Sequence, residues 1–302
     1  MTCKKLLRYI FVILCILFLT GCADIRNRVS PDALAVSENL LAVHISGQDG
    51  TVTAECDPLQ FPDAVSAAAG AKISAGHISV LMLSEDPARI LPAYLQNGWI
   101  APTAQVISAA DAVALLNSDP PSAEDIRAAA DTGQIPPRTA DTVLGDLLGG
   151  SGVTALTAHA ESGFRLDLWD DAGFCGTLPE SACRGLALLC GRYRTFTAAD
   201  AECCFTVDHA KPEIRAEMYG DILQISVSGT FRCGMRRGSL SDAERLLSTM
   251  LTAALSESVT LHGADLLQLR ERAGAGRYSR TAWRSVLQSA AFSTDITVTA
   301  GG

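Results

Sequence analysis

Two neighbouring stretches decide the fold class: residues 214–227 read IRAEMYGDILQISV, and residues 241–255 read SDAERLLSTMLTAAL. In the first stretch, apolar and polar residues alternate on both sides of a Tyr-Gly-Asp turn, and this period of two is typical of a β-hairpin. In the second stretch, apolar residues recur three and four positions apart, which predicts a long amphipathic helix. Strands grouped before a helix indicate an α+β domain rather than a repeated βαβ unit.

The boundaries of this C-terminal domain follow from its flanks. Ser241 and Glu244 match a capping box, so we expect the helix to start there and to span 242–255. A second helix around Trp283 and a closing strand through Ile296 and Val298 complete a domain predicted over residues 199–302.

Residues 40–198 contain short apolar runs separated by glycine and proline. Runs at 41–45 and 51–54 flank Gly-Gln-Asp-Gly, and runs at 153–159 and 164–169 predict a second strand pair. Helix starts are predicted at Pro62, Pro87, Ser122, Thr139 and Pro179. The run Gly149-Gly150-Ser151-Gly152 is interpreted as a flexible linker. We therefore predict a multi-domain α+β protein with mixed or antiparallel sheets and packed helices, in which 40–198 forms one or two subdomains.

The N-terminus has the three parts of an export signal. Lys4, Lys5 and Arg8 form a basic segment, and the apolar run 9–19 is too short to span a bilayer. The run ends in Leu-Thr-Gly-Cys at 19–22, which matches a lipobox: small residues fit the signal peptidase, and the cysteine sulfur takes a diacylglycerol. We predict a cleaved signal at 1–21, a lipid on Cys22 with acyl chains such as palmitate, and a partly ordered tether over 22–39. The alternative is an uncleaved anchor with an incidental cysteine.

Charge and cysteine content narrow the function classes. The net charge is −9, and removal of the three signal-peptide cations would take it to about −12, which disfavours nucleic acid as a partner. Seven cysteines remain after the lipid site, with no zinc-type spacing. Buried free thiols are the favoured interpretation, with one or two local disulfides or a Cys203–Cys204 redox pair as alternatives. The seven are Cys56, Cys175, Cys183, Cys190, Cys203, Cys204 and Cys233.

No motif indicates catalysis. The five histidines are scattered, outside any HExxH frame, and the glycine run lacks both the lysine of a P-loop and a GxSxG elbow. The pair Asp170-Asp171 fits either a cation site or a solvated turn. Arginines gather at 270–284. One interpretation is a solvated helix face, and the other is a contact with a lipid headgroup or with a partner through Arg277, Arg280 and Arg284. We expect no enzymatic activity, no cofactor and no metal.

Several blocks, read in order, resemble the Ger(x)C family of spore-germination lipoproteins. The blocks are the cleavage site at 19–26, the strand segment 72–85, the strand-to-helix passage 176–191, the segment 264–267 with Trp283, and the closing 296–301. Three departures are Ala23, where the family has tryptophan, 268–270, where the family has a glycine-aromatic ending, and an unusually high cysteine content.

The resemblance implies a non-enzymatic C subunit of a nutrient germinant receptor. Such a subunit works in sporulating bacteria with two integral-membrane subunits, of A and B type. It is held by its lipid on the outer face of the spore inner membrane. The alternative is a lipid-anchored solute-binding protein of a transporter, which would favour βαβ repeats and an aromatic cleft. A lipid-anchored hydrolase is a third option.

Overall fold

The structure is a computed structural model that describes residues 28–45, 50–118, 120–160 and 163–301. The predicted signal, Cys22 and the hairpin turn at 47–49 lie outside these residues. Among the described residues, no helix is long and apolar enough to cross a membrane.

The first large element is an eight-stranded mixed sheet with the order β10-β9-β8-β7-β6-β2-β3-β4. The central strands β2, β6, β7 and β8 run parallel, and antiparallel hairpins extend the sheet on both sides. Both predicted strand pairs are confirmed as β3–β4 and β8–β9. The strands are β2 Pro31–Ser37, β3 Leu40–Ile45, β4 Thr51–Glu55, β6 Val80–Leu83, β7 Gln105–Ser108, β8 Thr154–Ala160, β9 Gly163–Asp170 and β10 Gly173–Thr177.

Helices cover both faces of this sheet and bury different side chains. On one face, Leu34 and Val36 pack in a core with residues of α2, α3 and α6. On the other face, Ala33 and Ala35 pack in a core with residues of α4 and α5, where small side chains allow a close approach. The helices are α2 Asp63–Ala69, α3 Pro87–Gln96, α4 Ala112–Ser118, α5 Ala123–Asp131 and α6 Ala140–Gly149; the short elements η1 Pro58–Gln60 and η2 Ala75–His77 and the pair β1 Arg28–Val29 with β5 Lys72–Ile73 complete this part.

The predicted tether over 22–39 is wrong for its second half. Residues 31–37 form β2, which lies between β3 and β6 and is almost fully buried. Pro31 stands at the first position of the strand, where a missing N–H is tolerated. The prediction failed because polar residues precede Pro31 and because the strand alternates alanine, a weakly hydrophobic residue, with leucine and valine.

The second large element is a four-stranded sheet with the order β11-β12-β13-β14. The alternating stretches form the long antiparallel hairpin β12–β13, in which Tyr219 pairs with Ile222 around Gly220 at φ +65°. The closing strand β14 pairs parallel with β13. The elements are α7 Glu180–Cys190, β11 Phe196–Ala199, β12 Cys204–Tyr219, β13 Ile222–Arg237, α8 Leu240–Ala254, the π-helical η3 Leu255–Leu261, α9 Leu269–Arg272, α10 Arg280–Gln288 and β14 Ala291–Ala300.

The long amphipathic helix is confirmed as α8, and its cap lies two residues earlier than predicted. Ser239 and Asp242 form the capping box, so Ser241 and Glu244 lie inside the helix. Both spacings satisfy the capping pattern, and the turn at Gly238, with φ +84°, places Ser239 at the start. The stripe is buried as expected, with Leu247, Leu251 and Ala254 fully covered.

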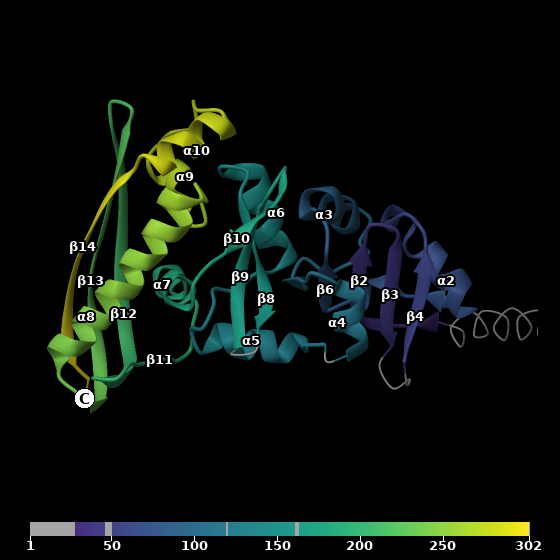
Figure 1. The fold of residues 1–302 in the computed structure, drawn as a ribbon, viewed down its shortest axis with the longest axis horizontal. Helices are drawn as coiled ribbons and strands as arrows, with labels where there is room; N and C mark the ends of the chain where they lie inside the picture. Colours follow the sequence, from purple (N-terminus) through teal and green to yellow (C-terminus); the bar gives the residue numbers. More distant parts are fainter. Residues whose placement is uncertain (1–27, 46–49, 119, 161–162, 302) are drawn as a thin grey trace, which may run out of the picture.

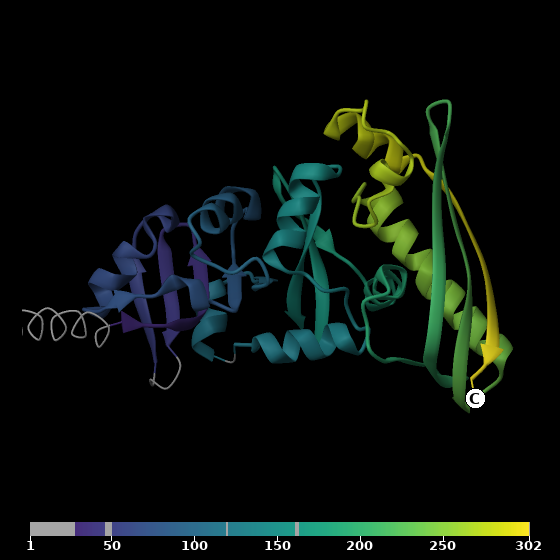
Figure 2. The same ribbon diagram turned by 180° about the vertical axis from the view of Figure 1, so that it is seen from behind.

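The sheets lie in a row along the molecule. The N-terminal strands stand at one end, β8–β10 lie in the middle, and the four-stranded sheet with the C-terminus lies at the other end (Figures 1 and 2). Two residue pairs connect β7 to β8, so the two halves of the large sheet are joined by a short stretch of strand pairing. The strand β11 begins at Phe196, close to the domain boundary predicted at 199.

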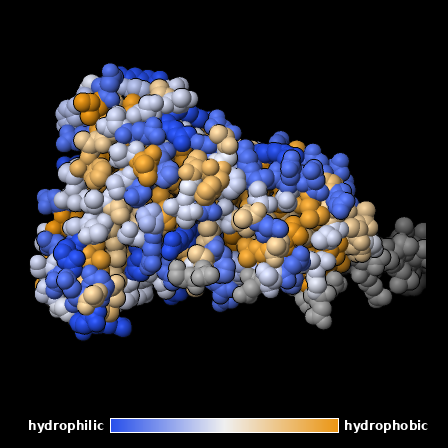
Figure 3. Space-filling view, viewed as in Figure 1, coloured by the Kyte–Doolittle hydropathy of each residue, from blue (hydrophilic) through white to orange (hydrophobic). Residues whose placement is uncertain are grey.

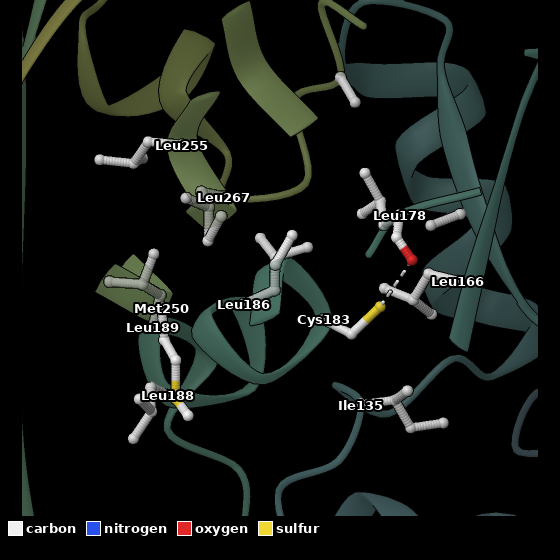
Figure 4. Packing of buried hydrophobic residues seen from close by; sticks show 14 of the residues in the cluster. Ile135, Leu166, Leu178, Cys183, Leu186, Leu188, Leu189, Met250, Leu255 and Leu267 are labelled. Atoms are coloured by element: carbon white, nitrogen blue, oxygen red, sulfur yellow. Dashed lines mark hydrogen bonds between the residues drawn. The ribbon is translucent and has the colours of Figure 1, made fainter. Parts of the chain in front are cut away.

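Helix α7 joins the middle part to the C-terminal sheet. On one side, the Cys183 thiol donates to the Leu178 carbonyl at 3.7 Å and packs near Leu166; on the other side, Leu189 lies beside Met250 of α8 (Figure 4). Gly185 makes the crossing of α7 and α8 possible, because a Cβ at this position would overlap the Met250 carbonyl oxygen.

We expect Gly185→Ala to destabilise the protein. The added methyl would push α8 away from α7, and overpacking of this kind costs about 1–3 kcal/mol. The matched control is Gly145→Ala in α6, where a Cβ meets nothing within 4 Å and alanine favours the helix. Urea unfolding should show a lower free energy of unfolding for Gly185→Ala and a higher one for Gly145→Ala. Equal changes would mean that α7 and α8 can move apart without a loss of stability.

Candidate functional site: the arginine-linked junction

The arginine cluster connects the C-terminal part to the middle of the molecule. Arg284 forms an ion pair with Asp170 at 2.6 Å, and the Arg280 guanidinium donates to the Leu148 carbonyl at 3.1 Å. Arg277 stays exposed, with its guanidinium 5.3 Å from the centre of the Tyr278 ring. Two of the three predicted partner-surface residues, Arg280 and Arg284, therefore bind the middle of the molecule, whereas Arg277 contacts only its neighbour Tyr278 in the described part.

Two arginines of the cluster bind the carbonyl end of α6. Arg280 binds the Leu148 carbonyl, and Arg270 donates to the Gly149 carbonyl at 3.1 Å. The last carbonyls of a helix lack partners within the helix and carry partial negative charge, so cations are stabilising there. The arginine cluster thus caps a helix of the neighbouring sheet.

The predicted flexible linker at 149–152 is instead packed into this junction. Gly150 and Ser151 are buried, and a Cβ on Gly150 would stand 3.1 Å from the Cβ of Asp265. A side chain at 150 would press against Asp265 and the Asp146 carbonyl oxygen, and the sequence pattern alone does not distinguish such close packing from flexibility.

Asp265 organises the C-terminal side of the junction. Its buried carboxylate accepts hydrogen bonds from the backbone N–H groups at the start of α9 and from the Trp283 indole at 2.8 Å. Gln268, directly before the first of these donors, has φ +57° and is the described non-glycine residue with a left-handed backbone. Such strain persists only where surrounding contacts impose it.

A polar cleft runs along the junction between α6 and residues 265–272. It comprises cavities of about 390 and 180 Å³ that share Thr142, Asp146, Arg192 and Gln268. Arg138 is buried beside the cleft and pairs with Asp146. Burial raises the pKa of the Asp146 carboxyl, and the Arg138 guanidinium opposes that rise.

The contacts of Asp170 bear on whether the pair Asp170-Asp171 forms a cation site or a solvated turn. Burial acts to raise the pKa of Asp170, but hydrogen bonds from Arg284, the Ala172 N–H and Cys175 hold it below its usual value. The carboxylate therefore stabilises the fold fully above its unfolded-state pKa of about 3.9, and this contribution is lost as the pH falls through the lower folded-state value. Asp170 serves the ion pair rather than a cation site.

Arg284→Gln should destabilise the protein, because it leaves the buried Asp170 carboxylate without its cation. We expect the free energy of unfolding at pH 7 to fall by about 1–3 kcal/mol, and the difference from wild type to shrink below about pH 4. Arg277→Gln is the matched control and should change stability by less than about 0.5 kcal/mol. Equal losses in both variants would contradict the assigned roles.

All seven cysteines of the described part are free, and no Cys203–Cys204 bond is present there. Cys183, Cys203 and Cys233 are buried, as the favoured interpretation expects, and the other four are half-buried. Burial raises the pKa of Cys183 to about 12 and that of Cys233 to about 11, so both thiols stay protonated at neutral pH. Within the described ranges, no three His, Cys, Asp or Glu residues are placed to hold a metal ion.

The comparisons define the class of fold. No family model and no curated protein matches the sequence. A solved structure, "Crystal Structure of the GerBC protein", is similar with a TM-score of 0.52 and 14% identity, over 88% of this chain and 96% of that chain. The chain therefore has a GerBC-like α+β fold, which confirms the fold that the Ger(x)C resemblance implies.

Proposed function

We propose that this chain is a lipid-anchored, non-enzymatic C subunit of a nutrient germinant receptor. The observation that carries the proposal is the GerBC-like fold over 88% of the chain, because it agrees with the order of the Ger(x)C-like blocks in the sequence. The lipobox at 19–22 adds a membrane attachment site, and the absence of a nucleophile, base and orienting acid in sequence motifs fits a structural role.

The shape of the molecule fits a tether at the N-terminus. The first described strands lie at one end of the row of sheets, and the four-stranded sheet lies at the opposite end (Figure 1). A lipid on Cys22 would hold the first end at the membrane. The C-terminal sheet would then be the part of the protein that lies farthest from the lipid.

The test is deletion of the gene in the spore former that encodes it. We expect spores to lose the response to one class of nutrient while dormancy and heat resistance stay intact, and the tagged protein to co-purify from spore membranes with two multi-span subunits. Co-purification with an ABC permease instead would support the solute-binding alternative. Turnover of ester, peptide or phosphate substrates by residues 23–302, abolished by one point change, would contradict the non-enzymatic role.

A further inference from the structure

The strand β14 forms an unusually long and open sheet edge. In the described part of the chain, the two large sheets end in β4 and β10 with five residues each, β11 with four, and β14 with ten. Figures 1 and 2 both show β14 on the outer side of the C-terminal sheet, approached there only by the first turns of α8. The other three edge strands are short, which is a common protection against unwanted pairing. Where β12 continues past β11, over residues 208–219, its open edge carries Lys211 and Pro212, which protect an edge in another way.

Two hydrogen bonds fix which backbone groups of β14 face outward. The Gly301 N–H donates to the Cys233 carbonyl of β13 at 2.7 Å, whereas the Val298 N–H donates to the Glu244 carboxylate of α8 at 3.4 Å. Because N–H groups alternate in direction along a strand, the even-numbered groups point away from β13. Those of residues 292, 294 and 296 have no acceptor in the part of the chain that the structure describes.

The side chains of β14 do not block its edge. The strand contains no lysine and no proline, and its one charged residue is the exposed Asp295. Thr294, Ile296 and Thr297 are β-branched, and such residues favour the extended conformation that strand pairing requires. Figure 3 shows that the surface at this end of the molecule is mixed, with apolar areas between hydrophilic ones. Glu244 closes the edge only at Val298.

We propose that β14 accepts an extended segment of another protein as a fifth strand of the C-terminal sheet. The open groups at 292–296 provide pairing for about five residues of the partner. Asp295 and Glu244 favour a lysine or arginine in that segment, since opposite charges across neighbouring strands are stabilising. A second copy of this chain is a poorer partner, because edge-to-edge pairing would place both acidic residues of each copy along one seam.

The test uses the mature chain and a labelled hexapeptide, Thr-Val-Lys-Val-Thr-Val, as the probe. Thr294→Pro removes one outward N–H at a position where an edge strand tolerates proline, while Thr294→Val keeps it. We expect the peptide to bind wild type and Thr294→Val alike, and to bind Thr294→Pro at least about tenfold more weakly, which is one lost hydrogen bond of about 1.4 kcal/mol.

A second variant separates the effect on binding from any effect on folding. Asp295→Lys keeps every N–H group and reverses the charge, so it should weaken binding of the lysine peptide and favour the same peptide with aspartate in place of lysine. Melting temperatures of all variants should match wild type. Absent or unchanged binding would overturn the proposal, and so would a wild-type dimer in sedimentation that Thr294→Pro dissociates. None of these outcomes depends on the receptor role.

Discussion

Leu247→Asp should leave the C-terminal domain unfolded or close to unfolding at room temperature. Leu247 is fully buried on the stripe of α8 and contacts the core that joins α7, α8 and the four-stranded sheet. An unpaired carboxylate there loses its hydration without gaining a partner, which costs several kcal/mol. The total stability of a domain is about 5–15 kcal/mol, so one such change removes a large part of it. Urea unfolding followed by circular dichroism measures the loss.

The matched control is Thr249→Asp on the same helix, where the side chain is exposed. It adds the same charge without burying it and should change the free energy of unfolding by less than about 0.5 kcal/mol. A native-like melting temperature for Leu247→Asp would mean that the stripe faces solvent or a partner instead of the sheet.

The C-terminal sheet could be predicted because its signals are local. Alternation on both sides of Gly220 places β12 and β13 next to each other, and the apolar stripe on α8 needs a sheet face to cover it. Two helix ends also follow a local rule: Gly70 and Gly191 end α2 and α7 with φ near +60°, the left-handed backbone that glycine adopts readily at a helix end.

The N-terminal strand could not be predicted because its partners are distant in sequence. β2 pairs with β6 about 47 residues later, and its inward side chains on one face are alanines, whose hydrophobic signal is weak. Burial of such a strand is decided by the helix that packs against it. Gly185 is a similar case, since its role depends on the Met250 carbonyl of another helix.

The arginine cluster shows why charge alone did not identify the junction. A set of cations on an acidic chain fits a solvated face, a partner surface or an internal contact equally well. The structure distinguishes them through acceptors that carry no charge in the sequence, the carbonyls of Leu148 and Gly149 at the end of α6. Arg277 and Arg280 are both exposed, but Arg277 alone of the three makes no contact with the middle of the described molecule, so it stays available to a partner.

Replacement of Cys22 with alanine, compared with replacement of Cys15, should distinguish a lipid anchor on Cys22 from an uncleaved N-terminal anchor. Cys22→Ala removes the sulfur that takes the diacylglycerol, so we expect incorporation of a labelled palmitate to disappear and the mature body to leave the membrane fraction in the absence of detergent. Each buried methylene of an acyl chain contributes about 0.8 kcal/mol, and two chains are needed for stable attachment, so their loss should release nearly all of the protein.

Cys15→Ala lies in the apolar run of the predicted signal and leaves the lipobox intact, so label and fractionation should match wild type. Label retained after Cys22→Ala would place the lipid elsewhere. Membrane retention that is unchanged in the unlabelled variant would favour the uncleaved anchor. Release with loss of label would instead make Cys22 the attachment point for the row of sheets that begins six residues later, at Arg28.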